Sequence, residues 1–306
     1  MNILIVGAGA IGSFYGSALA RQGARVSVVV RSDYELVGRE GYTISSALLG
    51  DHRFRPHQVY REPAACHEAQ EIVLLTTKVL PDVDRVSLLR TVVGPRTVIG
   101  LIQNGLDVEK EIAAAFPDNE ILSGLAFIAA ARNAPGRIHH YSYGSLTLGR
   151  YPHGESPTAR KLAAMFEASK VKCMVTNNVV TARWRKAVWN APFNPISILG
   201  GALDTQQILS SPEAEAFVRR AMQEVCDAAA ANGHPLSPEV IDDMIASTRA
   251  MPAYKTSMAL DYENGRPLEI EPILGAVIRA ARAAGVDTPA LESIYAIVKM
   301  IEAKRA

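Results

Sequence analysis

The sequence is poor in cysteine, in aromatic side chains and in net charge. Its three cysteines, Cys66, Cys173 and Cys226, lie far apart and form no CxxC pair, so neither a zinc knuckle nor a disulfide framework is indicated. Aromatic residues make up 6% of the chain, and 32 basic residues nearly balance 31 acidic ones. Nucleic-acid-binding proteins usually have a basic excess and aromatic platforms for the bases. We therefore expect no metal and no nucleic-acid partner.

Long apolar runs are also missing. The apolar N-terminus is interrupted at Gly7, Gly9 and Gly12, and no segment approaches the ~20 uninterrupted apolar residues that a membrane helix needs. The N-terminus lacks the charged start and the small-residue cleavage site of a signal peptide. Unpaired cysteines suit a reducing compartment. We expect a cytoplasmic protein without a membrane partner.

Apolar residues make up 48% of the 306 positions, which is enough for a large core, and the length favours two domains. In the first half, short apolar runs alternate with helical segments. This pattern predicts an α/β fold with a Rossmann-type, doubly wound parallel sheet. The runs expected as buried strands are residues 3–6, 26–30, 72–75 and 97–102. Two further short strands, 137–141 and 145–148, are expected at the far edge of the sheet.

From about residue 178 the strand pattern stops and helical periodicity begins. In the clearest helix, apolar residues that follow the i, i+3, i+4, i+7 rule form one face: Val218, Ala221, Met222, Val225, Cys226 and Ala229. Asn232-Gly233 is a typical end for this helix. We therefore expect a Rossmann domain over residues 1–177 and an all-helical domain over residues 178–306. The oligomeric state stays open, and a homodimer is compatible with the Ala-rich helices.

A glycine motif follows the first expected strand and opens the first expected helix. It reads Gly7-Ala8-Gly9-Ala10-Ile11-Gly12, which fits the dinucleotide-binding pattern GxGxxG. In that pattern the first glycine makes a tight turn, the second lets the backbone approach a pyrophosphate, and the third lets helix and strand pack closely. The helix N-terminus then favours the phosphates. The alternative is a strand–turn–helix unit without a ligand.

The end of the second expected strand bears on the choice of cofactor. NAD-binding proteins place an acidic residue there to accept a hydrogen bond from the ribose, whereas this chain has Arg31. A planar guanidinium suits the 2′-phosphate of NADPH. A solvated arginine is the alternative, and Asp33, two residues later, complicates the assignment.

Polar residues follow two later strands, where a doubly wound sheet forms its ligand crevice. Thr77-Lys78 follows one, and Gln103-Asn104-Gly105 follows the other. In the helical half, Lys186, Asn190 and Asn194 are four residues apart and share one helix face. The alternatives are a solvated lysine, an ordinary Asn-Gly turn and a surface lysine with two cap-like asparagines. Pro192 lies between the two asparagines and could turn Asn194 away from that face.

Taken together, these motifs resemble the ketopantoate reductase (2-dehydropantoate 2-reductase) family over nearly the whole chain. Their order and spacing are far more specific than any single motif. The resemblance rests on the N-terminal glycines, Arg31, Lys78, Gln103-Asn104-Gly105, residues 184–195, Ser257-Met258, Gly265-Arg266 and Glu269-Ile270.

The resemblance implies NADPH-dependent reduction of ketopantoate to pantoate, a step in the synthesis of pantothenate, the coenzyme A precursor. By the same resemblance, Lys186 is the general acid and Glu269 supports it. Asn190, Asn194 and Ser257 orient the substrate, while Asn104 and Lys78 lie where cofactor and substrate meet. This agrees with the chemistry, since reducing a ketone needs a proton donor aimed at the forming oxyanion.

The chain also departs from the family pattern. The family often has Ser-Met-Leu-Gln-Asp where this chain has Ser257-Met-Ala-Leu-Asp261, and often has aspartate at the position of Glu271. One alternative is therefore a reductase of another branched 2-keto acid on the same scaffold. The other is a non-catalytic NADPH-sensing protein, against which the presence of both Lys186 and Glu269 argues.

Overall fold

The computed structural model describes residues 1–305, which divide into two compact units. The first unit contains Met1–Gln103 and Val108–Val179, and the second contains Asn104–Asp107 and the residues from Val180 onward. The short segment Asn104–Asp107 thus belongs to the second unit, although the residues on both sides of it belong to the first.

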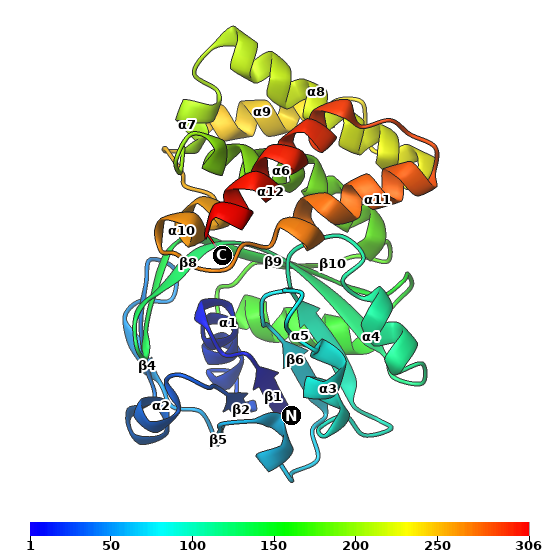
Figure 1. The fold of residues 1–306 in the computed structure, drawn as a ribbon. Helices are drawn as coiled ribbons and strands as arrows, with labels where there is room; N and C mark the ends of the chain where they lie inside the picture. The colour runs from blue at the N-terminus through cyan, green and yellow to red at the C-terminus, as the bar shows by residue number, and fades with distance from the viewer. Residues whose placement is uncertain (306) are drawn as a thin grey trace. The chain divides into compact units, whose positions relative to one another are not determined.

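Within residues 1–305, the first unit forms one mixed sheet of ten strands (Figure 1), in the order β4-β3-β9-β8-β7-β6-β1-β2-β5 with β10 paired to β9. The strands are β1 Asn2–Val6, β2 Arg25–Val29, β3 Tyr42–Ser46, β4 His52–Phe54, β5 Val59–Tyr60, β6 Ile72–Leu75, β7 Val98–Ile102, β8 Ile121–Ala134, β9 Arg137–Arg150 and β10 Cys173–Val175. The helices of this unit are α1 Ala10–Ala20, α2 Tyr34–Glu40, α3 Arg85–Arg90, α4 Lys110–Ala115 and α5 Pro157–Ala168, with a 3₁₀ turn at Pro63–Ala65.

The central strands are apolar because both faces of the sheet are covered. Ile3 and Ile5 of β1 join the core that contains residues of α1 and α5. Leu4, between them, joins the opposite core with Leu89 of α3 and Ile112 of α4. Successive side chains of a strand point to opposite faces, so a continuous apolar run is needed to fill both cores. The predicted α/β fold with a Rossmann-type parallel sheet is confirmed, and the strands beyond β7 make the complete sheet a mixed one.

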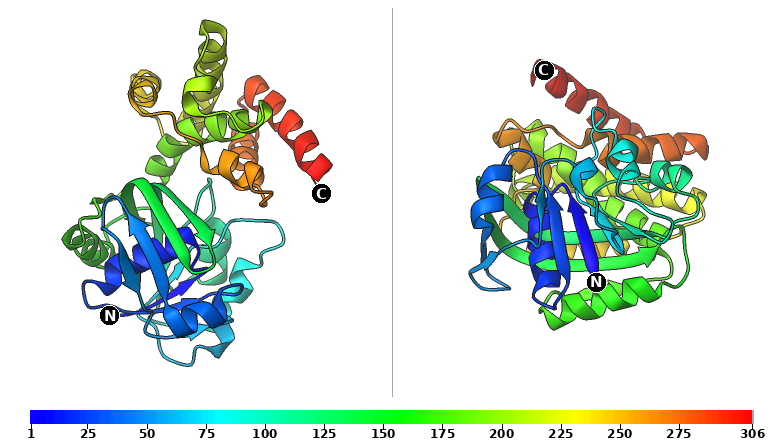
Figure 2. Two further views of the ribbon diagram at one scale, coloured as in Figure 1. Left: turned by 90° about the vertical axis from the view of Figure 1, so that its left-hand side faces the viewer. Right: turned by 90° about the horizontal axis from the view of Figure 1, so that it is seen from below.

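The prediction of two short edge strands at 137–141 and 145–148 is wrong. Both belong to the single strand β9, which pairs antiparallel with β8 over most of its length and parallel with β3. Figure 2 shows these two long green strands side by side. Tyr143 and Gly144 have positive φ values of 66° and 112°, and the β8–β9 register shifts nearby. This irregularity interrupts the alternation in the sequence without ending the strand.

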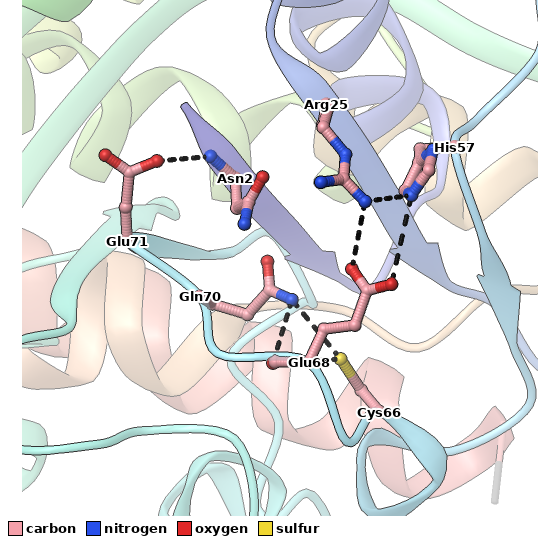
Figure 3. A network of polar contacts seen from close by, with 7 residues as sticks. All are labelled: Asn2, Arg25, His57, Cys66, Glu68, Gln70 and Glu71. Carbon is pink, nitrogen blue, oxygen red and sulfur yellow. Dashed lines mark hydrogen bonds and ion pairs between the residues drawn. The ribbon is translucent and has the colours of Figure 1, made fainter.

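A polar cluster fastens the amino ends of the central strands (Figure 3). The main-chain N–H of Asn2 donates to Glu71 at 2.6 Å, and Arg25, at the start of β2, lies 2.6 Å from His57 Nε2. Glu68 forms an ion pair with Arg25 at 3.6 Å, and its carboxylate also lies 3.9 Å from His57 Nε2. In a parallel sheet ligands bind beyond the opposite, carboxyl ends of the strands, so this cluster holds the strand starts in place.

The second unit is helical throughout its described elements. They are α6 Val179–Leu199, α7 Thr205–Ile208, α8 Pro212–Ala231, α9 Val240–Ala250, α10 Ser257–Glu263, a π-helical turn at Glu271–Gly275, α11 Ala276–Ala283 and α12 Pro289–Arg305. The predicted apolar face of α8 is buried, apart from half-buried Cys226. Glu224 of α8 accepts hydrogen bonds from the main-chain N–H groups of Ala290 and Leu291 at 2.9 Å each, which ties α8 to the start of α12. No helix within residues 1–305 combines the length and apolarity that a bilayer crossing requires.

Candidate active site

The glycine motif forms a tight turn between β1 and α1. Gly7 has a φ of 90°, and a Cβ on it would lie 2.5 Å from the side chain and 2.8 Å from the backbone N of Thr77. A Cβ on Gly12 would lie 2.5 Å from Thr76 Oγ1, whereas one on Gly9 would meet nothing nearer than the Gly7 carbonyl oxygen at 3.9 Å. The absence of a Cβ at Gly7 and Gly12 therefore lets Thr76 and Thr77, which follow β6, pack against the turn and the start of α1. Gly9 leaves the outer side of the turn open. This arrangement fits a pyrophosphate at the start of α1.

Arg31 is exposed just beyond β2, whereas Asp33 is buried with its carboxylate engaged inside the protein. Arg132 of β8 donates from Nη1 to Asp33 Oδ1 at 3.0 Å and to Ser32 Oγ at 2.7 Å. The N–H of Gly136 donates to Asp33 Oδ2 at 2.9 Å. Both oxygens of Asp33 thus have protein donors, and the guanidinium of Arg132 lies close to this carboxyl end of β2. Asp33 is therefore already engaged within the protein, and the preference for NADPH stays a prediction.

The loop after β6 is fastened to the end of β7. Gln103 Nε2 donates to the Thr77 carbonyl oxygen at 2.7 Å, and buried Arg85 donates to Gln103 Oε1 at 3.2 Å. Arg85 also binds the Val108 carbonyl and Glu111. These contacts fix Thr77 and so limit where Lys78, the next residue, can lie. The position of Lys78 at the carboxyl end of β6 agrees with the predicted cofactor contact, which stays a prediction.

Asn104 and Gly105 lie against the π-helical turn of the second unit. Gly105 has a φ of 109°, and a Cβ on it would lie 2.5 Å from Pro272 Cβ and 2.6 Å from the Pro272 carbonyl oxygen. The N–H of Leu106 donates to this same carbonyl at 2.9 Å, and the Leu106 side chain enters the helical core. Only glycine permits this close approach, which fixes the backbone next to Asn104.

The fixed loop brings Asn104 to Lys186 on α6. Lys186 Nζ donates to Asn104 Oδ1 at 2.9 Å. The pKa of Lys186 is lowered to about 7 by burial first and by the charge of Arg183 second, while the carboxylate of Glu269 acts in the opposite direction. An amine that titrates near neutral pH can donate a proton and be reprotonated under the same conditions. A general acid needs both properties.

The two asparagines on the Lys186 face of α6 have different surroundings. Helix α6 continues through Pro192 and Pro195, so Pro192 does not turn Asn194 away from the helix line. Asn194 is 2% exposed, and its Oδ1 accepts weak bonds from Ser257 Oγ at 3.3 Å and from the N–H of Met258 at 3.4 Å. Asn190 and Ser257 are more accessible. Asn194 therefore joins α6 to α10, and Asn190 and Ser257 are better placed for a ligand.

Three arginines of these sites were not recognised in the sequence: Arg85, Arg132 and Arg183. Arg85 and Arg132 act on partners 18 and 99 residues away, so no local pattern reveals them. Arg183 could have been recognised from the sequence, because a cation three residues before Lys186 lies on the same helix face. The predicted residues of the helical unit, Lys186 with Asn104 and Asn194 with Ser257, are brought together as pairs. Their functional roles stay predictions.

Comparison with known proteins identifies the family. The family model described as Ketopantoate reductase PanE/ApbA matches residues 3–153, and the one described as Ketopantoate reductase PanE/ApbA C terminal matches residues 178–302. This chain belongs to the ketopantoate reductase family. Its members are pyridine-nucleotide oxidoreductases, and this ketopantoate reductase homologue is therefore an oxidoreductase.

Individual relatives match this chain along nearly its whole length. The 2-dehydropantoate 2-reductase of Nostoc sp. is 31% identical over 98% of this chain and 95% of its own. The crystal structure of 2-dehydropantoate 2-reductase from Methylococcus capsulatus is 53% identical, with a TM-score of 0.95 over 100% of this chain and 98% of its own. A structure of D-mandelate dehydrogenase with NADH and anilino(oxo)acetate covers 100% of this chain and 99% of its own with a TM-score of 0.90, but at 23% identity it shows a shared fold alone.

Proposed function

We propose that this protein reduces ketopantoate to pantoate with NADPH, in the cytoplasm, on the route to pantothenate. The observation that carries the proposal is the pair formed by Lys186 and Asn104, in which an amine with a pKa of about 7 is held at 2.9 Å by an amide oxygen. The family to which the chain belongs and the 2-dehydropantoate 2-reductases that it resembles support the choice of substrate.

Bound NADPH supplies the hydride that adds to the keto carbon. As the carbonyl double bond becomes a single bond, its electron pair moves to oxygen, and Lys186 Nζ donates a proton there. Lys186 is left as a neutral amine and regains a proton from water. Before the transfer, its ammonium charge stabilises the developing alkoxide. Asn104 holds the amine in one position, and Glu269 favours its protonated form.

The substrate is an anion with hydroxyl and keto groups, and Asn190 and Ser257 offer it an amide and a hydroxyl. We expect Asn190→Ala and Ser257→Ala mainly to raise KM with a smaller effect on kcat, because the lost bonds serve ground and transition states alike. Steady-state kinetics with the keto acid varied would measure this. Ser210→Ala, an exposed serine of the same unit, is the control. Unchanged KM in both variants would exclude these two residues as substrate contacts.

NADPH is expected to bind more tightly than NADH. Arg31 is exposed at the end of β2, and Asp33 is already engaged by Arg132 and Gly136. A charge-assisted bond to phosphate contributes about 1.5–3 kcal/mol, so Arg31→Ala should raise the NADPH dissociation constant about 10- to 100-fold and leave that of NADH nearly unchanged. Isothermal titration with both nucleotides measures this, with Arg39→Ala on α2 as a matched exposed arginine. Equal affinity of the unaltered protein for both nucleotides would overturn the preference.

The substrate is tested by following NADPH oxidation with a panel of 2-keto acids. Ketopantoate should give the highest kcat/KM, and smaller branched 2-keto acids should be slower. A higher kcat/KM for another branched or bulky 2-keto acid would keep the reductase chemistry and change the substrate. Absence of turnover with every 2-keto acid, although NADPH binds, would overturn the proposed function.

A further inference from the structure

Arg183 and Lys186 hold two consecutive residues of one loop. Arg183 Nη1 donates to the Gly105 carbonyl oxygen at 3.0 Å, and Lys186 Nζ donates to Asn104 Oδ1 at 2.9 Å. The two cations are three residues apart on α6, so they are neighbours on its surface. Arg183 is 4% exposed. The loop is thus held on one side by α6 and on the other by Pro272, whose carbonyl accepts the N–H of Leu106.

This arrangement of two cations costs free energy of folding. Burying a guanidinium carries a desolvation penalty, and two like charges at this helix spacing repel each other. Arginine cannot lose its proton in a protein, so Lys186 is the member of the pair that can respond. The charged groups that shift the pKa of Lys186 include Arg183, from its own helix, and Glu269, from the segment before the π-helical turn. Asn104, from the facing loop, is neutral.

We propose that Arg183 is a positioning residue for proton transfer: it fixes the Gly105 peptide, and with it Asn104, and its permanent charge favours release of the proton from Lys186. This inference rests on the proposed role of Lys186 as the general acid. It assigns two separable effects to one side chain, a geometric effect through the Gly105 carbonyl and an electrostatic effect on Lys186.

Two variants separate the effects. Arg183→Gln removes the charge but keeps an N–H donor for the Gly105 carbonyl, whereas Arg183→Met removes both. The positive charge of Arg183 disfavours the protonated form of Lys186. Removing that charge should therefore raise the pKa of Lys186 from about 7 by about one unit. A general acid must be protonated, so the fall of kcat at high pH should move upward by the same amount in both variants. The kcat plateau at low pH should fall about 10-fold in Arg183→Met and less than threefold in Arg183→Gln, since a small displacement of reacting groups can cost up to about 100-fold.

The experiment combines two measurements. Acetylation with limiting acetic anhydride across pH, quantified at Lys186 by mass spectrometry, gives the pKa of this amine without any substrate. The pH profile of kcat for NADPH-dependent keto-acid reduction gives the catalytic effect. Arg185→Gln is the matched control, because Arg185 is an exposed cation next to Lys186 on the same helix and should leave both readouts unchanged.

The outcomes are distinct. A raised labelling pKa in both variants, with a plateau that falls further in Arg183→Met, supports the inference. An unchanged labelling pKa in Arg183→Gln overturns it, even where the enzyme reduces ketopantoate normally. Conversely, absence of keto-acid reduction in the unaltered protein overturns the proposed function, and the labelling data still report whether Arg183 acts on Lys186. Circular dichroism confirms folding, and Arg183→Gln keeps the test decisive where Arg183→Met does not fold.

Discussion

Replacing Lys186 with alanine is expected to lower kcat by about 10²–10⁴-fold, the usual contribution of general acid catalysis. The change removes both the proton donor and the positive charge that faces the forming alkoxide. The dissociation constant of NADPH should barely change, because the glycine turn and Arg31 belong to the other unit. Stopped-flow or steady-state assays give kcat, and titration of NADPH fluorescence gives the dissociation constant.

Two further variants show which property of Lys186 matters. Lys186→Arg should not restore the rate, because arginine keeps the charge but does not release a proton. Arg185→Gln removes a neighbouring exposed cation and should leave kcat nearly unchanged. If Lys186→Ala kept most of its activity, the proton would come from another group and the assignment of Lys186 would be wrong.

Gly105→Ala is expected to lower kcat by about 100-fold. The residue has a φ of 109°, and the new Cβ would lie 2.5 Å from Pro272 Cβ and 2.6 Å from the Pro272 carbonyl oxygen. The loop must therefore move, and Asn104 with it. A displacement of about 1 Å at a catalytic group can cost about 100-fold in rate. The strained backbone alone should lower the free energy of unfolding by about 1–3 kcal/mol, which urea denaturation measures.

A matched glycine separates the two effects of this substitution. Gly233, after α8, has a φ of 83°, and a Cβ on it would meet nothing within 4 Å. Gly233→Ala should therefore cost only the conformational penalty of about 1–2 kcal/mol and leave kcat unchanged. Normal kcat in Gly105→Ala would show that the approach of the loop to Pro272 does not position Asn104.

The parts of the fold that could be predicted from sequence are those with a local cause. Short apolar runs mark the central strands because both faces of each strand are buried, and the apolar stripe of α8 marks a helix with one buried face. The sequence predicts two short strands within β9 because glycine is a turn signal, whereas the structure continues the strand through Tyr143 and Gly144 with positive φ values. Strand β3 is not predicted by its own sequence, because it pairs with residues of β9 about 94 positions away. Strand β4 pairs in turn with β3.

In the candidate site too, the features with a local cause could be predicted from the sequence, and those that depend on distant partners could not. Lys186, Asn190 and Asn194 were visible because their spacing matches the helical repeat. The effect of Pro192 could not be decided from sequence, because only the packing around α6 determines whether a helix continues through a proline. The bond between Lys186 and Asn104 joins positions 82 residues apart, and it depends on the contact of Gly105 with Pro272. Arg183 was visible as a charge, but its role depends on the Gly105 carbonyl that it meets.

The membership of Asn104–Asp107 in the second unit affects how this enzyme can be recombined with its relatives. A chimera that joins the front half of one reductase to the back half of another at a single point near residue 178 would combine a loop from one parent with the Arg183, Lys186 and Pro272 of the other. Such hybrids should fold and bind nucleotide yet turn over poorly. Transplanting residues 104–107 together with the helical half should restore turnover, because the loop and the residues that hold it then come from the same parent.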